Sequence, residues 1–135
     1  MSITAIEIEN FKGIGERVRV ELRPITLLFG PNSSGKSTAI QALHYLREIF
    51  LAGNVDAHHP EAVGEAIDLG GFKKFVHMHE LDRSVRIRAE LNLEDEEFGG
   101  YGLLERDECV FNESVRTAWV EVAISWNSAE ERPFV

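Results

Sequence analysis

The chain has 135 residues, of which 44% are hydrophobic, and its formal net charge is −9. This composition suits one folded domain, or part of one, and excludes a disordered chain. No apolar run approaches the roughly 20 residues that a membrane-spanning helix needs, the N-terminus lacks the pattern of a signal peptide, and a single cysteine excludes an internal disulfide framework. We therefore expect a cytoplasmic protein with no membrane association.

The negative charge is concentrated in the second half of the sequence. Residues 1–60 contain six Lys or Arg and six Asp or Glu, so all nine excess negative charges lie in residues 61–135. An acidic surface repels a phosphate backbone. The chain by itself is a poor candidate for a general DNA-binding protein.

Two short strands are predicted at the N-terminus. Residues 3–9 alternate, with Ile6 and Ile8 on one side and Glu7 and Glu9 on the other. Asn and two glycines predict a turn over residues 10–15, and residues 17–22 alternate again. We expect the two strands to form an antiparallel pair that ends at Pro24.

The next segment has the pattern of a strand, a glycine-rich loop and a helix. Residues 25–29 (Ile-Thr-Leu-Leu-Phe) are almost wholly apolar, which predicts a strand buried on both faces of a parallel sheet. Residues 30–37 (Gly-Pro-Asn-Ser-Ser-Gly-Lys-Ser) match the phosphate-binding pattern G-x-x-x-x-G-K-[ST]. From Lys36 to about residue 50, apolar residues recur at helical spacing, and Gly53 is the predicted stop. We expect the apolar face of this helix to contain Ile40, Leu43, Leu46 or Arg47, and Phe50.

Each residue type in this loop suits the binding of a triphosphate. Gly30 and Gly35 allow the backbone to approach phosphate oxygens, and the amides of Asn32, Ser33, Ser34 and the residues up to Ser37 lie at a helix N-terminus. Lys36 supplies a mobile positive charge for the β- and γ-phosphates, and the Ser37 hydroxyl is a hard oxygen ligand for Mg²⁺. The alternative is a chance match in a Gly/Ser-rich turn, and the flanking strand and helix patterns argue against it.

The rest of the chain predicts mainly strands. Residues 61–69 suggest a short helix, residues 71–77 an ordered segment docked by Phe72, Phe75 and Val76, and residues 94–108 a solvated acidic loop. Residues 84–93 and 117–126 alternate clearly, the second with Val120, Val122, Ile124 and Trp126 on one face. We expect Trp119 and Trp126 to fill a sheet core rather than to stack on bases.

Five histidines raise the question of a metal site. On a strand, His77 and His79 would direct both rings to one face, a spacing that can bind zinc, and Cys109 is a further candidate ligand. The sequence has no second cysteine and no His-x₃₋₅-His helix. We therefore interpret these histidines as ordinary side chains.

The first 50 residues resemble the start of a known family. The phrase Glu9-Asn10-Phe11-Lys12, a second short strand, and residues 25–38 around the glycine loop are similar to the RecF/SMC/OLD-like branch of ABC-type P-loop ATPases. Residues 68–77 more loosely resemble OLD-like and bacterial defence AAA-type ATPases. The resemblance implies an α/β P-loop NTPase, with residues 1–135 forming an N-terminal ABC-type lobe. This lobe would combine a P-loop strand–helix unit with an antiparallel β-subdomain that includes residues 84–93 and 114–126.

The resemblance also implies a nucleotide site and its partners. ATP and Mg²⁺ would bind at Gly30, Asn32, Ser33, Ser34, Gly35, Lys36, Ser37 and Thr38, with Ser37 as the metal ligand. The loop over residues 10–15 would lie near the base and ribose, where Phe11 or Lys12 would contact the nucleotide. The alternative for Phe11 is a plain turn with its ring in the core. The full protein would form a homodimer around ATP and act in DNA repair or phage defence, with nucleic acid as a further partner.

The departures from the family concern catalysis. No apolar run ends in the Asp-Glu pair that supports Mg²⁺ and polarises the attacking water, and the serine–glycine signature helix is missing. Gln41, the only glutamine, falls inside the predicted helix, so the family's mobile glutamine has no evident counterpart unless His77 or His79 replaces it. We assign no catalytic residue and expect a C-terminal lobe or second chain to complete the site. The alternatives are a small P-loop kinase and a non-catalytic module that dimerises in response to nucleotide.

Overall fold

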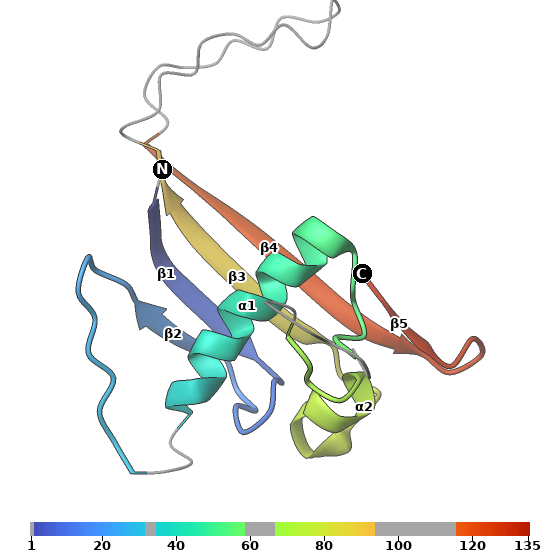
Figure 1. Ribbon diagram of the computed structural model, residues 1–135. Coiled ribbons are helices and arrows are strands. Elements are labelled where there is room, and N and C mark those ends of the chain that lie inside the picture. The colour runs from blue at the N-terminus through green and yellow to red at the C-terminus, as the bar shows by residue number, and fades with distance from the viewer. Residues whose placement is uncertain (1, 32–34, 59–66, 94–115) are drawn as a thin grey trace, which may run out of the picture.

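The computed structural model describes residues 2–31, 35–58, 67–93 and 116–135, which form a sheet with helical segments against one of its faces (Figure 1). The strands are β1 (Ser2–Glu9), β2 (Val18–Glu21), β3 (Val85–Asn92), β4 (Thr117–Asn127) and β5 (Arg132–Phe134). The helical segments are α1 (Lys36–Ala52), α2 (Phe72–Phe75) and the 3₁₀ turn η1 (His77–His79). Within the described residues, no helix is long and apolar enough to span a membrane.

The sheet is antiparallel throughout, in the order β2-β1-β3-β4-β5. The predicted pairing of the first two strands is confirmed, with Ile8 opposite Val18. The N-terminal strand also pairs with β3 from Ser2–Asn92 to Glu9–Arg86, with a bulge between Ile3 and Ala5. Two strands about 80 residues apart in the sequence therefore lie side by side in the sheet.

The core lies between the sheet and the helical segments. Predicted inward positions are confirmed on β3 and β4, where Val85, Ile87, Val122 and Ile124 are buried. The segment over residues 71–77 is docked as predicted, because Phe72, Phe75 and Val76 are all buried. Phe75 packs at 5.5 Å from Phe11 and 5.0 Å from Tyr45, measured between ring centroids, so aromatic rings link three separate elements.

Glycine conformations mark both ends of α1, as predicted. Gly35 precedes the helix in the left-handed region, with φ 88°, and Gly53 ends it there, with φ 65° and its N–H bonded to the Ile49 carbonyl at 3.0 Å. The predicted apolar face is confirmed in part: Leu46 is buried and Leu43 packs against the core, whereas Ile40 and Phe50 are more than half exposed. The buried residues of the helix are Ala39, Ala42, Tyr45, Leu46 and Glu48. Two small alanines allow the helix to approach the sheet closely, and this contact determines its rotation.

The predicted buried strand over residues 25–29 is not formed. This segment has no regular secondary structure, and Ile25, Leu27 and Phe29 are 82%, 70% and 85% exposed. The Thr26 hydroxyl accepts a hydrogen bond from the Arg23 N–H at 2.8 Å and thereby closes a turn over residues 23–26, at the start of the segment. Among the described residues, no strand lies beside the segment to pair with it, and an apolar strand without sheet neighbours has nothing to bury it.

One further prediction needs correction at the C-terminal end, and one strand there was not predicted. Trp126 stacks on Phe72 at 6.0 Å between ring centroids, in line with a core position, but Trp119 is 60% exposed and carries the Arg88 guanidinium over its ring at 4.4 Å. The side chains of β4 alternate, so Trp119 falls on the outer face. Strand β5 was not predicted; it contains Pro133, which an edge strand tolerates.

The outer face of the sheet carries a network of ion pairs. Arg17 contacts Glu7, Glu9 and Glu121 at 3.1–3.4 Å, and Arg19 contacts Glu7 and Glu90 at 3.0 and 3.1 Å. The hydrogen bonds from Arg19 lower the pKa of Glu90. Burial alone would raise the pKa of Glu121, but hydrogen bonds from Arg86 and Arg17 outweigh it and leave that pKa below its usual value.

The predictions for residues 61–69 and 94–108 fall largely or wholly outside the described residues.

Candidate functional site

The predicted phosphate-binding loop leads directly into the N-terminus of α1. Gly35 has a left-handed backbone that a residue with a side chain rarely adopts, and Lys36 is the first residue of the helix. The first turn of the helix contains no acidic residue, and its N-cap residue, Gly35, has no side chain with which to cap it. The amides of this turn and the positive end of the helix dipole therefore favour an anion at this position.

The Lys36 side chain folds back over its own loop. Its ammonium group donates hydrogen bonds of 2.6 Å to the carbonyl oxygens of both Gly30 and Pro31. Gly30 has φ 145°, in the region that favours glycine. The structure thus brings together Gly30, the first residue of the phosphate-binding pattern, and Lys36 near its end.

Not every predicted ligand is placed. Ser37 is exposed and Thr38 is half-buried, both in the first turn of α1, whereas Asn32, Ser33 and Ser34 lie outside the described residues. An exposed hydroxyl in the first turn fits the hard oxygen ligands that Mg²⁺ takes. Gly30, Gly35, Lys36, Ser37 and Thr38 therefore lie together at one end of the helix.

The loop over residues 10–15 lies against the same helix. The Lys12 ammonium donates a 2.8 Å hydrogen bond to the side-chain oxygen of Gln41, in the second turn of α1. Ile14 lies closest to Gly35, because a Cβ built there would be 3.9 Å from Ile14. Of the two side chains predicted to meet the nucleotide, Phe11 is fully buried and stacks on Tyr45 at 5.9 Å. Phe11 therefore takes the core position given as its alternative, and Lys12 stays the candidate nucleotide contact.

His77 and His79 do not direct their rings to one face of a strand. These residues form a 3₁₀ turn rather than a strand, and their rings go to different partners. His77 Nδ1 lies 2.8 Å from the Lys12 carbonyl, and His79 Nδ1 lies 2.7 Å from the Lys73 carbonyl. Among the described residues, no three His, Cys, Asp or Glu side chains gather where they would hold a metal ion.

Sequence reasoning missed the roles of Gln41 and His77 in holding Lys12. Neither has a recognisable spacing relative to the loop, because the contacts join positions 29 and 65 residues apart. The signal available in the sequence was the clustering of Asn10, Gly13 and Gly15 around Lys12, which indicates a sharply turned backbone.

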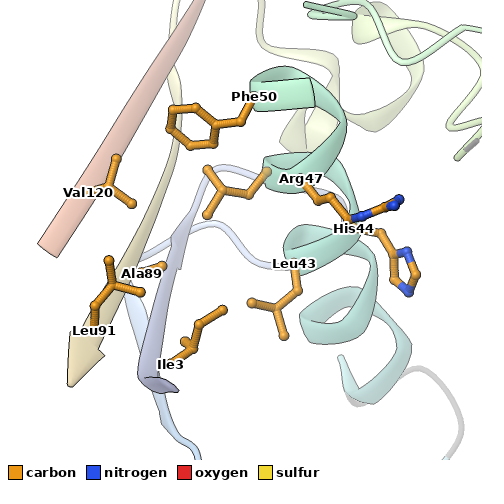
Figure 2. Close-up of a pocket in the computed structure, with 9 residues that line it drawn as sticks. Ile3, Leu43, His44, Arg47, Phe50, Ala89, Leu91 and Val120 are labelled. Atoms are coloured by element: carbon orange, nitrogen blue, oxygen red, sulfur yellow. The ribbon is translucent and has the colours of Figure 1, made fainter. Parts of the chain in front are cut away.

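An apolar groove lies away from the phosphate-binding loop, along the second half of α1 (Figure 2). It has a volume of about 450 Å³ and separates the helix from strands β1, β3 and β4. It is lined by Ile3, Leu43, His44, Leu46, Arg47, Phe50, Ala89, Leu91 and Val120. Its position shows that unfilled apolar surface remains between helix and sheet.

Comparison with known proteins identifies the family of this chain. The model of the AAA ATPase domain family matches residues 1–99. The DNA replication and repair protein RecF of Prosthecochloris aestuarii is 40% identical over 45 residues, which are 33% of this chain and 12% of that protein. The matched segment is thus a small part of the RecF chain. The resemblance to RecF-like P-loop ATPases is confirmed, and the chain belongs to the AAA ATPase domain family.

Proposed function

We propose that residues 1–135 form the N-terminal lobe of an ATPase and bind ATP with Mg²⁺ at the loop over residues 30–37. The observation that carries this proposal is the position of Lys36. Its ammonium group closes the glycine loop at the uncapped start of α1, with 2.6 Å bonds to Gly30 and Pro31. A bound phosphate would take over these hydrogen bonds, since a charged acceptor binds an ammonium group more strongly than a carbonyl does.

Magnesium fits the same end of the helix. The Ser37 hydroxyl is exposed in the first turn, which contains no carboxylate to compete for the ion. When bound, Mg²⁺ would neutralise charge on the β- and γ-phosphates. The chain would contribute the amides, Lys36 and Ser37 to binding and orientation. We expect Lys12, which bonds Gln41 in the second turn of the same helix, to contact the base and ribose.

Hydrolysis requires parts that this sequence does not contain. It has no apolar strand ending in Asp-Glu to polarise water. We therefore expect ATP hydrolysis only when a C-terminal lobe and a second copy complete the site. Exposed apolar surface supports this expectation, because large apolar patches mark places where another protein segment binds. This surface comprises Ile25, Leu27, Phe29 and the groove of Figure 2.

Coupling to DNA processing or to defence is the proposed role of the complete protein. It is supported by the name of the RecF relative, a DNA replication and repair protein. Closure of a head-to-head dimer on ATP would control that role. The net charge of −9 indicates that contact with nucleic acid would involve a local surface or a partner.

The small P-loop kinase is the less favoured alternative. Kinases of this class return from the first helix to a parallel strand. In the described part of this chain, the strands after α1 are all antiparallel. The second alternative is a module that dimerises in response to nucleotide. It would have the same fold and would differ only in that it does not hydrolyse ATP.

Isothermal titration of this chain with Mg·ATP tests the proposal. Lys36→Ala should weaken ATP binding at least about tenfold, equivalent to about 1.4 kcal/mol, because it removes a charged hydrogen-bond donor. Lys74→Ala is the matched control, since Lys74 is an exposed lysine of α2 remote in sequence from the loop. Unchanged ATP affinity in Lys36→Ala, or no binding by the folded unaltered chain, would contradict the assignment.

A further inference from the structure

The backbone of Lys12 is held in an uncommon conformation by the segment that contains α2 and η1. Its φ is 53°, in the left-handed region that non-glycine residues rarely occupy. The Lys12 N–H donates a 2.6 Å hydrogen bond to the Phe75 carbonyl, and the Lys12 carbonyl accepts one of 2.8 Å from His77. Both polar backbone groups of this residue are therefore bonded to residues more than 60 positions away.

The tautomer of His77 follows from its partner. A carbonyl oxygen can only accept a hydrogen bond, so the Nδ1 atom of His77 must carry the hydrogen. The other ring nitrogen, Nε2, lies on the far side of the ring. That side faces Gly15: a Cβ added to Gly15 would lie 2.7 Å from Nε2 and 2.9 Å from Cδ2. The ring thus occupies the space that the absent Gly15 side chain leaves.

Hydrogen bonds within the loop over residues 10–15 close it beside the His77 ring. The Asn10 N–H bonds to the Gly15 carbonyl at 3.1 Å, and Phe11 and Ile14 exchange hydrogen bonds of 2.8 and 2.9 Å. In this closed form the Lys12 side chain reaches Gln41 of α1. His77 therefore fixes the turn from which Lys12 extends towards the helix that begins at the phosphate-binding loop.

We propose that His77 is a positioning residue of the nucleotide site. By bonding the Lys12 carbonyl and packing on Gly15, it holds the Asn10–Gly15 loop so that Lys12 contacts the base and ribose end of ATP. This inference rests on the proposed function, because it requires ATP at the loop over residues 30–37. It adds that the α2–η1 segment controls affinity for the nucleoside part of the ligand and leaves the phosphate part unaffected.

Titrations with Mg·ATP and with magnesium tripolyphosphate, which has no nucleoside, separate the two parts. His77→Ala and Lys12→Ala should each weaken ATP binding about tenfold, as loss of one charged hydrogen bond does, and leave tripolyphosphate binding unchanged. Lys36→Ala should weaken the binding of both. Since His77 acts through Lys12, the double variant should bind ATP no more weakly than either single variant.

Matched controls exist on both sides of the contact. Gly13→Ala should bind ATP normally, because a Cβ at Gly13 meets nothing within 4 Å, whereas Gly15→Ala should bind as weakly as His77→Ala. His79→Ala should be neutral, because His79 bonds Lys73 rather than Lys12. His77→Asn keeps an amide donor for the Lys12 carbonyl, so it should retain ATP binding.

Two results would overturn this role of His77. One is ATP binding that depends on Lys36 but is the same in His77→Ala as in the unaltered chain, which leaves the proposed function intact. The other is an equal loss of ATP and tripolyphosphate in both His77→Ala and His77→Asn, since that pattern would reflect damage to the whole site. Absence of binding by the folded unaltered chain would refute the proposed function, and the role of His77 with it.

Discussion

The Lys12 ammonium group donates a 2.8 Å hydrogen bond to the side-chain oxygen of Gln41 and so joins the loop after β1 to the helix after the phosphate-binding loop. Gln41→Glu should strengthen this contact and weaken ATP binding. The new carboxylate attracts Lys12, which stabilises the fold by at most about 1 kcal/mol at a partly exposed position. The same carboxylate holds Lys12 away from the ligand and repels the triphosphate.

The prediction is specific because ATP affinity should fall while the stability of the fold should stay the same or rise. Titration with Mg·ATP should show reduced affinity, while urea denaturation should show unchanged or slightly higher stability. His44→Glu places a carboxylate at an exposed site one turn further along α1 and serves as the control. Equal effects of the two variants on ATP affinity would mean that Gln41 has no special place at the site.

The aromatic cluster should dominate the stability of the described domain. Phe11 is fully buried, 5.9 Å from Tyr45 and 5.5 Å from Phe75 between ring centroids. Phe11→Ala should lower the free energy of unfolding by about 3–5 kcal/mol, because it opens a cavity between three elements. Trp119→Ala, on the exposed outer face, should lower it by about 1 kcal/mol or less. Urea denaturation would distinguish the two, and similar losses would contradict this arrangement of the core.

The outer ion-pair network predicts a dependence of stability on pH. The pKa values of Glu90 and Glu121 are lowered below 4.5 in the folded chain by their arginine partners. A lowered folded-state pKa contributes stability that is present above the unfolded value and is lost as the pH falls through the folded value. Stability should therefore decline below about pH 4.5, the unshifted value of both groups.

The contribution of the network can be isolated by removing one charge. Glu90→Gln should reduce stability at neutral pH and flatten the decline in acid, as measured by thermal denaturation across the pH range. Glu16→Gln, an exposed position outside the network, should follow the unaltered chain. An unchanged acid profile in Glu90→Gln would show that the ion pairs make no net contribution.

The exposed apolar segment should be dispensable for the fold of this chain. Phe29 is 85% exposed and Leu27 is 70% exposed, so Leu27→Ser and Phe29→Ser should change the free energy of unfolding by about 0.5 kcal/mol or less. Both should reduce concentration-dependent association in sedimentation experiments, because they remove apolar surface. A large loss of stability would show that the segment is buried in solution, contrary to the structure.

Local patterns predicted the elements whose determinants are local. Two-residue alternation identified β1, β3 and β4, and Gly35 and Gly53 mark the two ends of α1 in both sequence and structure. The rotation of α1 could not be predicted, because its apolar residues cover more than one face. Only contact with the sheet selects Ala39 and Ala42 over Ile40 and Phe50.

The candidate site could be proposed from the sequence where a motif defines its geometry. The glycine loop and Lys36 could be assigned from spacing alone, because anion binding needs those residue types in that order. The composition of residues 25–29 could not show whether a strand forms there, because strand pairing depends on which neighbouring strands are present. The contact of His77 with Lys12 forms because the tertiary fold places the η1 turn beside residues 10–15, and no periodicity in the sequence indicates it.

The pairing of β1 with β3 joins residues 2–9 to residues 86–92, at opposite ends of a long stretch of chain. Contacts so distant in sequence form slowly, because a large loop must close before they stabilise anything. During synthesis, β1 emerges well before β3, with only β2 as a neighbour. The candidate phosphate-binding loop lies within that stretch, so we expect the fold around it to be complete only after the first strand has paired with a strand made much later.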